Sequence, residues 1–186
     1  MSLHLTLNWY TQHEDNEMST IKNVQTIKTK NGTTAQTIDS SGRILTPARP
    51  AFLAYDSSSG WRDYTAHGAA VDMVWGATRF NIGGHFSTST GKFTCPVAGI
   101  YNFRCWAYVA TSVHKNFLYL NKNGSDIQST VMDNGDTNET AVVSGLVQCS
   151  ANDLIHMKYS CDVEATGNVF SNASEQWTGF EGYLIG

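Results

Sequence analysis

The sequence predicts an all-β protein built as a two-sheet sandwich or barrel, and three observations support this prediction. Charged residues make up only 15% of the 186 residues, against a usual share of about 25%. Neutral polar residues fill the difference, with 20 Thr, 17 Ser and 14 Asn. The 16 Gly and 21 aromatic residues favour short strands joined by tight turns over a helical bundle or a coiled coil.

The first 48 residues do not have the composition of a globular domain. In segment 1–17, Leu3, Leu5, Leu7 and Trp9 alternate with polar residues, which predicts a strand with one apolar face. It lacks the positive charge and the continuous apolar run of a secretory signal. Segment 18–48 has few large aliphatic residues among many Thr, Lys, Asn and Gln. Such a stalk or linker orders only if copies of it wrap around each other.

From residue 49 to 186 the pattern changes to short, aromatic-rich strands at hairpin spacing. In the longest strand, at 99–109, large side chains occupy both faces, so we expect the domain core on one side and a partner subunit on the other. The turns at 122–124 and 134–135 are typical of hairpins. The strands that we predict are 51–55, 71–75, 79–86, 92–95, 99–109, 116–121, 125–132, 139–149, 153–160 and 177–185.

Charge and hydropathy exclude several classes of partner. The net charge of -4 gives no basic surface for nucleic acid. No apolar run approaches the roughly 18 residues needed for a membrane span, so we expect no membrane insertion. The four cysteines have no CxxC spacing. We interpret them as reduced, buried, small hydrophobic residues, with disulfides as the alternative.

The string WGATRFNIGGHFSTSTGKFTCPVAGIYNF, at residues 75–103, resembles the signature of C1q-like domains in the C1q/TNF jelly-roll superfamily. Residues 49–52 resemble the opening strand of that family, and 180–185 resemble its closing strand. Cys105 departs from the family, which usually has an aromatic residue there. The resemblance implies a ten-stranded jelly-roll sandwich at 49–186, after an extended fibrous N-terminal segment. The signature positions are Trp75, Asn81, Phe86, Phe93, Gly99, Tyr101 and Phe103. We expect its aromatic residues in the core and Gly99 at a tight bend.

The family resemblance also implies a homotrimer. The Thr- and Asn-rich segment before residue 49 resembles the stalk-to-head junction of bacteriophage tail-fibre proteins with C1q-like heads. The expected function is therefore adhesion to a host-surface molecule, either a glycan or an outer-membrane component. The expected location is a virion, assembled in the host cytoplasm, with residues 1–17 binding another virion protein. The alternatives are a capsid decoration or cement protein and, third, a secreted C1q-like lectin.

Loop lengths suggest where a ligand binds. Alternate loops of an antiparallel sandwich share one end, and the two longest expected loops, 56–70 and 161–176, lie opposite the entry at Pro50. The first contains Trp61, Arg62, Asp63 and Tyr64. These residues are the candidate ligand site, because aromatic rings stack on sugar faces. The alternative is that Trp61 and Tyr64 pack the loop against the head.

We expect no enzymatic activity and no resident cofactor. The sequence lacks the G-x-S-x-G elbow, a phosphate-binding loop and zinc-ligand spacing among its histidines. The one metal-like string is the acidic loop 133–139, in which Asp133 and Asp136 are the candidate calcium ligands. A solvated turn is the alternative, because Asn, Asp and Gly are ordinary turn residues.

Overall fold

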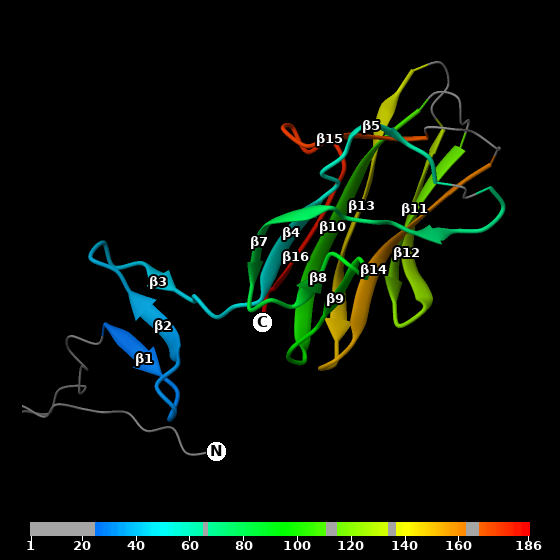
Figure 1. Ribbon diagram of the computed structural model, residues 1–186. Helices are drawn as coiled ribbons and strands as arrows, with labels where there is room; N and C mark the ends of the chain where they lie inside the picture. The colour runs from blue at the N-terminus through cyan, green and yellow to red at the C-terminus, as the bar shows by residue number, and fades with distance from the viewer. Residues whose placement is uncertain (1–24, 65–66, 111–114, 134–136, 163–167) are drawn as a thin grey trace, which may run out of the picture. The chain divides into compact units, whose positions relative to one another are not determined.

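The computed structural model describes residues 25–64, 67–110, 115–133, 137–162 and 168–186 (Figure 1). The chain divides into two compact units, Met1–Arg49 and Pro50–Gly186. The regular structure in the described residues is all β-strand, which confirms the predicted fold class. The predicted strand at 1–17 lies outside the described residues.

The first unit contains a small antiparallel sheet in the order β1-β2-β3. Its strands are β1 (Thr26–Lys28), β2 (Thr34–Ile38) and β3 (Ile44–Leu45). Both connecting turns contain a glycine with positive φ, 87° at Gly32 and 79° at Gly42. Asp39 stabilises the second turn, because its carboxylate accepts hydrogen bonds from the backbone N–H groups of Ser41 and Arg43.

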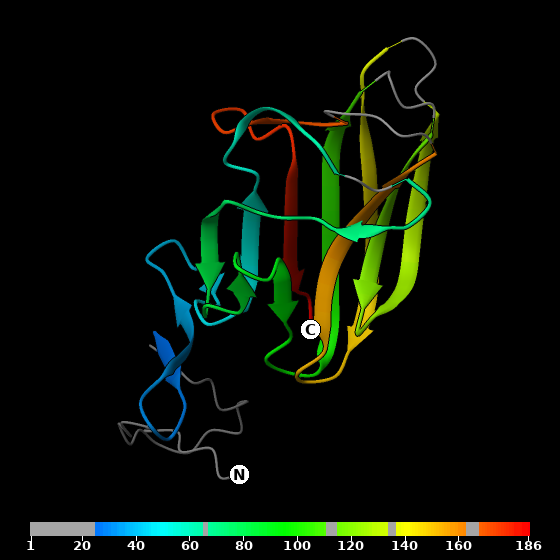
Figure 2. The same ribbon diagram turned by 45° about the vertical axis from the view of Figure 1, so that its right-hand side comes forward.

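The second unit, which we call the head, is a jelly-roll sandwich of two facing sheets (Figures 1 and 2). The seven-stranded sheet has the order β5-β15-β10-β16-β4-β7, with β13 paired to β10. Its strands are β4 (Ala51–Tyr55), β5 (Ser59–Arg62), β7 (Ala77–Ile82), β10 (Gly99–Val109), β13 (Glu139–Cys149), β15 (Val169–Asn172) and β16 (Gly179–Leu184).

The six-stranded sheet has the order β12-β11-β14-β9-β8, with β6 paired to β14. Its strands are β6 (Val71–Asp72), β8 (Phe86–Ser87), β9 (Lys92–Thr94), β11 (Lys115–Lys122), β12 (Ser125–Asp133) and β14 (Leu154–Cys161). Every pairing between named strands in the two sheets is antiparallel.

Strand β10 runs through the seven-stranded sheet with one face in the core. Tyr101, Phe103, Cys105, Ala107 and Val109 are each at most 1% exposed, as the alternation predicts. The rings of Phe52, Phe93, Phe103 and Phe180 form the centre of the core, with centroids 4.9–6.2 Å apart. Each such side chain contributes roughly 1.5–3 kcal/mol by leaving water. All four cysteines are buried as well, and burial raises the pKa of the Cys105 thiol.

The signature residues shape the fold. Asn81 is the informative one: its amide accepts from the Phe86 N–H at 3.1 Å and donates to the Phe86 carbonyl at 2.8 Å. It thereby ties the end of β7 to the start of β8. Gly99 is needed for close approach and not for the expected bend, because a Cβ there would lie 2.7 Å from Leu184 Cδ1 and 2.8 Å from the Gly186 carbonyl oxygen.

Two strand predictions are wrong in instructive ways. The strand expected at 79–86 is two strands, β7 and β8, in different sheets. The chain turns between them at Gly83 and Gly84, which have φ of 82° and 72°. In addition, each long loop expected at 56–70 and 161–176 contains a strand. These strands, β5 and β15, pair with each other at one margin of the seven-stranded sheet. Strands at the margin of a sheet carry a weaker sequence pattern than central ones.

The strand register defines the two ends of the head. Pro50 lies at the entry end, where its carbonyl accepts a hydrogen bond from the N–H of Leu184 at 3.0 Å. Strands β10, β12 and β14 finish at the opposite end, because Val109 pairs with Glu139 and Asn116 pairs with Cys161. We call this opposite end the far end (Figure 1). The predicted candidate residues at 61–64 lie toward it.

Candidate functional site

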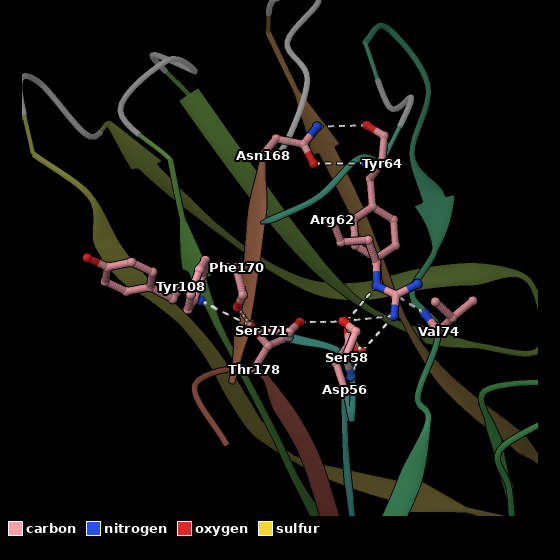
Figure 3. A network of polar contacts seen from close by, with 10 residues as sticks. All are labelled: Asp56, Ser58, Arg62, Tyr64, Val74, Tyr108, Asn168, Phe170, Ser171 and Thr178. Carbon is pink, nitrogen blue, oxygen red and sulfur yellow. Dashed lines mark hydrogen bonds and ion pairs between the residues drawn. The ribbon is translucent and has the colours of Figure 1, made fainter. Parts of the chain in front are cut away.

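A network of polar contacts includes two of the residues predicted to bind a ligand, Arg62 and Tyr64 (Figure 3). The Asp56 side chain is fully buried and accepts hydrogen bonds from Arg62 Nε and Nη2, both at 2.6 Å. It also accepts from Ser171 Oγ at 2.6 Å and from the N–H of Ser58 at 3.0 Å. Burial by itself raises the pKa of Asp56, but the hydrogen bonds outweigh it and hold that pKa below its ordinary value. The guanidinium of Arg62 therefore makes a contact within the head.

Tyr64 belongs to the core. It is 6% exposed, and its ring lies 5.7 Å from that of Tyr159. Its hydroxyl accepts a hydrogen bond from the N–H of Val74, and burial raises the pKa of Tyr64 to about 12. Asn168 locks the backbone of Tyr64: the Asn168 amide accepts from the N–H at 2.9 Å and donates to the carbonyl at 2.7 Å. Tyr64 thus packs within the head, as the alternative to ligand binding describes.

Trp61 has a different environment, because it is 44% exposed and belongs to an aromatic cluster. Its ring lies 5.1 Å from Phe170 and 6.1 Å from Tyr108. Trp177, 38% exposed, completes the cluster at 4.9 Å from Tyr108. The sequence did not indicate that Tyr108, Phe170 and Trp177 join Trp61, because they come from β10, β15 and the segment before β16. The signal for this cluster that the sequence did offer was the aromatic residues within and next to the two long segments 56–70 and 161–176.

The four predicted residues are thus divided by the structure. Trp61 and Asp63 are exposed, whereas Arg62 and Tyr64 make internal contacts. A ligand that contacts this region would meet the aromatic cluster first. Binding of a ligand at 61–64 stays a prediction.

Of the two predicted calcium ligands, the structure describes only Asp133. Asp133 ends β12 and is exposed, and Asp136 lies outside the described residues. Within the described part of the chain, no group of three or more His, Cys, Asp or Glu side chains could hold a metal ion. A search of the same residues finds no helix with the length and apolar character needed to cross a membrane.

The outer side of the seven-stranded sheet carries a second candidate surface, which we call the apolar face. Strand register aligns its side chains in rows across β7, β4, β16, β10 and β13. One row is Ile82, Ala51, Tyr183, Asn102 and Leu146. Another row is Ala77, Tyr55, Gly179, Trp106 and Val142. Leu146 is 68% exposed, and Phe80, Ile82 and Tyr183 are each about 40–45% exposed.

Charge on the apolar face is sparse: besides one ion pair, the Arg79 guanidinium lies over the Tyr55 ring, 5.6 Å from its centroid. In the row between the two above, Arg104 and Glu181 are register neighbours with their charged atoms 3.8 Å apart. Arg104 also lies over the ring of Trp106, at 5.3 Å from its centroid. A contiguous apolar surface of this kind is unusual for a monomer and is typical of protein–protein contact sites.

Comparison with known proteins agrees with this architecture. The profile of the C1q domain family matches residues 59–185. Protein HP-25 homolog 1 of Bos taurus is 29% identical over 118 residues, which is 63% of this chain and 52% of the relative. The chain thus spans about half the length of that relative.

The similar solved structures share the fold at low sequence identity. The globular domain of zebrafish complement 1qA protein has a TM-score of 0.56 at 18% identity, over 74% of this chain and 98% of that one. Eiger TNF from S. frugiperda has 0.57 at 14%, over 75% and 94%. Murine APRIL has 0.55 at 10%, over 74% and 99%.

Proposed function

Because the chain belongs to the C1q domain family, whose members are typically trimeric binding modules and generally not enzymes, we propose that it is a homotrimeric adhesion module. In this proposal the apolar face is covered by neighbouring copies of the same chain. The far end of the head, with Trp61, binds the ligand. Closed symmetric assembly hides an apolar sheet face that a monomer would leave in water.

The apolar face is the observation that supports this proposal. Its exposed Phe80, Ile82, Leu146 and Tyr183 lie on strands that the core already holds rigid, so their exposure is a property of the fold. The Arg104–Glu181 pair neutralises the charge between them. A neighbouring copy brings the same apolar character, whereas a polar or charged partner would leave these side chains unmatched.

Leu146→Glu tests the trimer. The change places a carboxylate at the most exposed of these apolar positions, where a neighbouring subunit would have to remove it from water. Light scattering should give three times the chain mass for the unaltered protein and one chain mass for the variant, with unchanged circular dichroism.

The control for Leu146→Glu is Ile127→Glu. Ile127 is 44% exposed and lies on β12, in the six-stranded sheet. This variant should remain trimeric. A monomeric unaltered protein at micromolar concentration would contradict the proposal.

Trp61→Ala tests the ligand site. Trp61 is partly exposed, so the melting temperature should change little while binding to the target cell surface falls about tenfold or more. Ile127→Ala, with the same exposed fraction, is the control and should keep full binding. If Trp61→Ala dissociates the trimer, the aromatic cluster belongs to the subunit interface and the proposed ligand site is wrong.

The proposal also includes a location: the head of a bacteriophage tail fibre, with residues 18–48 as stalk, 1–17 as the attachment to another virion protein, and a host glycan or outer-membrane component as ligand. The support is the polar, Thr- and Asn-rich composition of the N-terminal unit, which the small β1-β2-β3 sheet fits. A capsid decoration protein would have the same head and N-terminal segments, but it would be attached to the capsid shell and not to the tail fibre.

One observation favours a second candidate, a C1q-like lectin outside any virion: the similar proteins come from animals. Immunogold labelling of intact virions with an antibody against residues 50–186 separates these settings. Labelled fibre tips support the tail-fibre head, labelled shells support the capsid protein, and unlabelled virions would leave only the lectin.

A further inference from the structure

A polar depression lies on the outer side of the six-stranded sheet, away from the apolar face. Its volume is about 520 Å³, and its lining includes Asp72, Lys92, Asn121, His156 and Lys158. Register explains why these residues meet. Lys92, His156 and Asn121 form one row across β9, β14 and β11. Asp72 pairs with Lys158, two residues further along β14. Small-molecule sites are typically concavities of this size with a few convergent polar groups.

The carboxylate of Asp72 is oriented from two sides. Its Oδ1 lies 3.0 Å from His156 Nε2, and its Oδ2 lies 3.4 Å from Lys92 Nζ. The Asp72 side chain nevertheless remains 47% exposed, so both oxygens keep room for further hydrogen bonds. An oriented carboxylate that is still open to solvent is prepared to accept hydrogen bonds from a ligand.

His156 is a nearly buried part of the lining. Its side chain is only 7% exposed, and its Nδ1 is buried with no hydrogen-bond partner. Buried polar atoms are almost always paired, so this nitrogen is an exception. With Nε2 donating to Asp72, the ring orients the carboxylate that a ligand would meet. Burial lowers the pKa of His156, which keeps the imidazole neutral at pH 7.

The rim of the depression is rigid. At the β11–β12 turn, Asn121 Oδ1 accepts from the N–H of Gly124 at 2.8 Å, and its Nδ2 donates to Asp126 at 2.6 Å. Asn123 accepts from the N–H of Leu154 and donates to Asp153, both at 2.8 Å. A site held in place before binding loses little conformational entropy when the ligand arrives.

The charges of the depression select the class of ligand. Asp72 and Lys92 balance each other, and Lys158 lies 3.5 Å from Asp126. An anion would meet the Asp72 carboxylate, and a cation would meet two ammonium groups. Donors and acceptors alternate over a few ångströms, which matches hydroxyl groups because each both donates and accepts. Leu154, which is 40% exposed, is the apolar side chain of the lining and can contact an apolar ligand face.

We infer that this depression binds a neutral saccharide, with Asp72, Lys92 and Lys158 hydrogen-bonded to its hydroxyl groups. The site is separate from the Trp61 cluster and complete within one chain. Only its multivalency rests on the proposed trimer: covering the apolar face would leave three such depressions open, so that weak single sites combine by avidity.

Titration with methyl glycosides of glucose, galactose and mannose tests this inference, with the imidazole NMR signal of His156 as the local readout. At least one glycoside should bind with a millimolar dissociation constant and shift that signal. Inorganic phosphate and glucosamine, as an anion and a cation, should bind more weakly or not at all. No binding by any of the three glycosides, or stronger binding of a charged probe, would overturn the inference.

Two variants locate the binding. Asp72→Asn and Lys158→Gln should each weaken glycoside binding by about tenfold, because each removes a charge-assisted hydrogen bond. Glu139→Gln, the same carboxylate-to-amide change at the start of β13, should bind like the unaltered protein. Unweakened binding in both Asp72→Asn and Lys158→Gln would place the saccharide elsewhere and refute the site.

Light scattering of the same samples separates this inference from the proposed function. If the protein is a monomer that binds the glycosides, the proposed trimer is wrong and the proposed saccharide site stands. If it is a trimer that binds none of them, the trimer stands and the saccharide site is wrong.

Discussion

Replacing Asp56 by alanine is expected to lower the free energy of unfolding of the head by about 3 kcal/mol. Removing one partner of a buried ion pair costs about 3–5 kcal/mol, because the other charge is left uncompensated. The lower end applies here, since the Arg62 side chain keeps 31% exposure and water can reach it. The variant also leaves the hydroxyl of Ser171 and the N–H of Ser58 without their acceptor, because both donate to Asp56. Urea denaturation gives the free energy directly.

Asp63→Ala is the matched control for Asp56→Ala. Asp63 carries the same carboxylate and lies one residue beyond Arg62, but it is exposed. Its loss should change the unfolding free energy by no more than about 0.5 kcal/mol. Equal effects of the two substitutions would show that the Asp56 network does not hold β5 and β15 to the head.

The same network predicts how stability depends on acid. The folded pKa of Asp56 lies below its ordinary value, which is about 3.9 for an unfolded chain. Its stabilising contribution is therefore complete above about pH 4 and is lost as the pH falls through the lowered folded value. Below about pH 4, the unfolding free energy of the unaltered protein should fall more steeply than that of Asp56→Ala.

Gly182→Ala is expected to destabilise the head by about 1–3 kcal/mol, which is the usual cost of overpacking a core. Gly182 lies in β16 between its register neighbours Phe103 and Phe52, and an added Cβ would clash with the Phe103 ring and lie 2.8 Å from Phe52 Cε1. Both rings are at most 1% exposed and have nowhere to move. Thermal unfolding of the variant should show a melting temperature lower by several degrees.

Gly145→Ala provides the contrast. Gly145 also lies within a strand of the seven-stranded sheet, but an added Cβ would meet only the end of the Gln128 side chain. Gln128 is exposed, so its side chain can rotate away at the loss of one surface hydrogen bond, from its Nε2 to the Ser144 carbonyl. Because alanine restricts the unfolded chain more than glycine, stability should stay equal or rise by up to about 1 kcal/mol. A loss as large as that of Gly182→Ala would mean that the two sites differ in something other than packing.

The local pattern of the sequence was sufficient for much of the head. Alternation in 99–109 identified the buried face of β10, since side chains of a strand point to opposite sides in turn. The resemblance of residues 75–103 to the C1q-like signature implied the jelly roll. The hairpin turn predicted at 122–124 was equally local, and Gly124 there has a φ of 90°. In each case the information lies in residues close together in the chain.

The remaining features depend on residues that are far apart in the chain. Asp56 meets Ser171 across 115 positions, and Tyr64 meets Asn168 across 104, so no window of sequence shows that 61–64 is half core and half surface. The apolar face arises from register across five strands. The polar depression arises in the same way, from register across four strands. Composition and periodicity determined the fold class and the core of this protein. Strand pairing alone decided which polar side chains converge, because hydrogen-bond register, and not sequence distance, sets what lies beside what in a sheet.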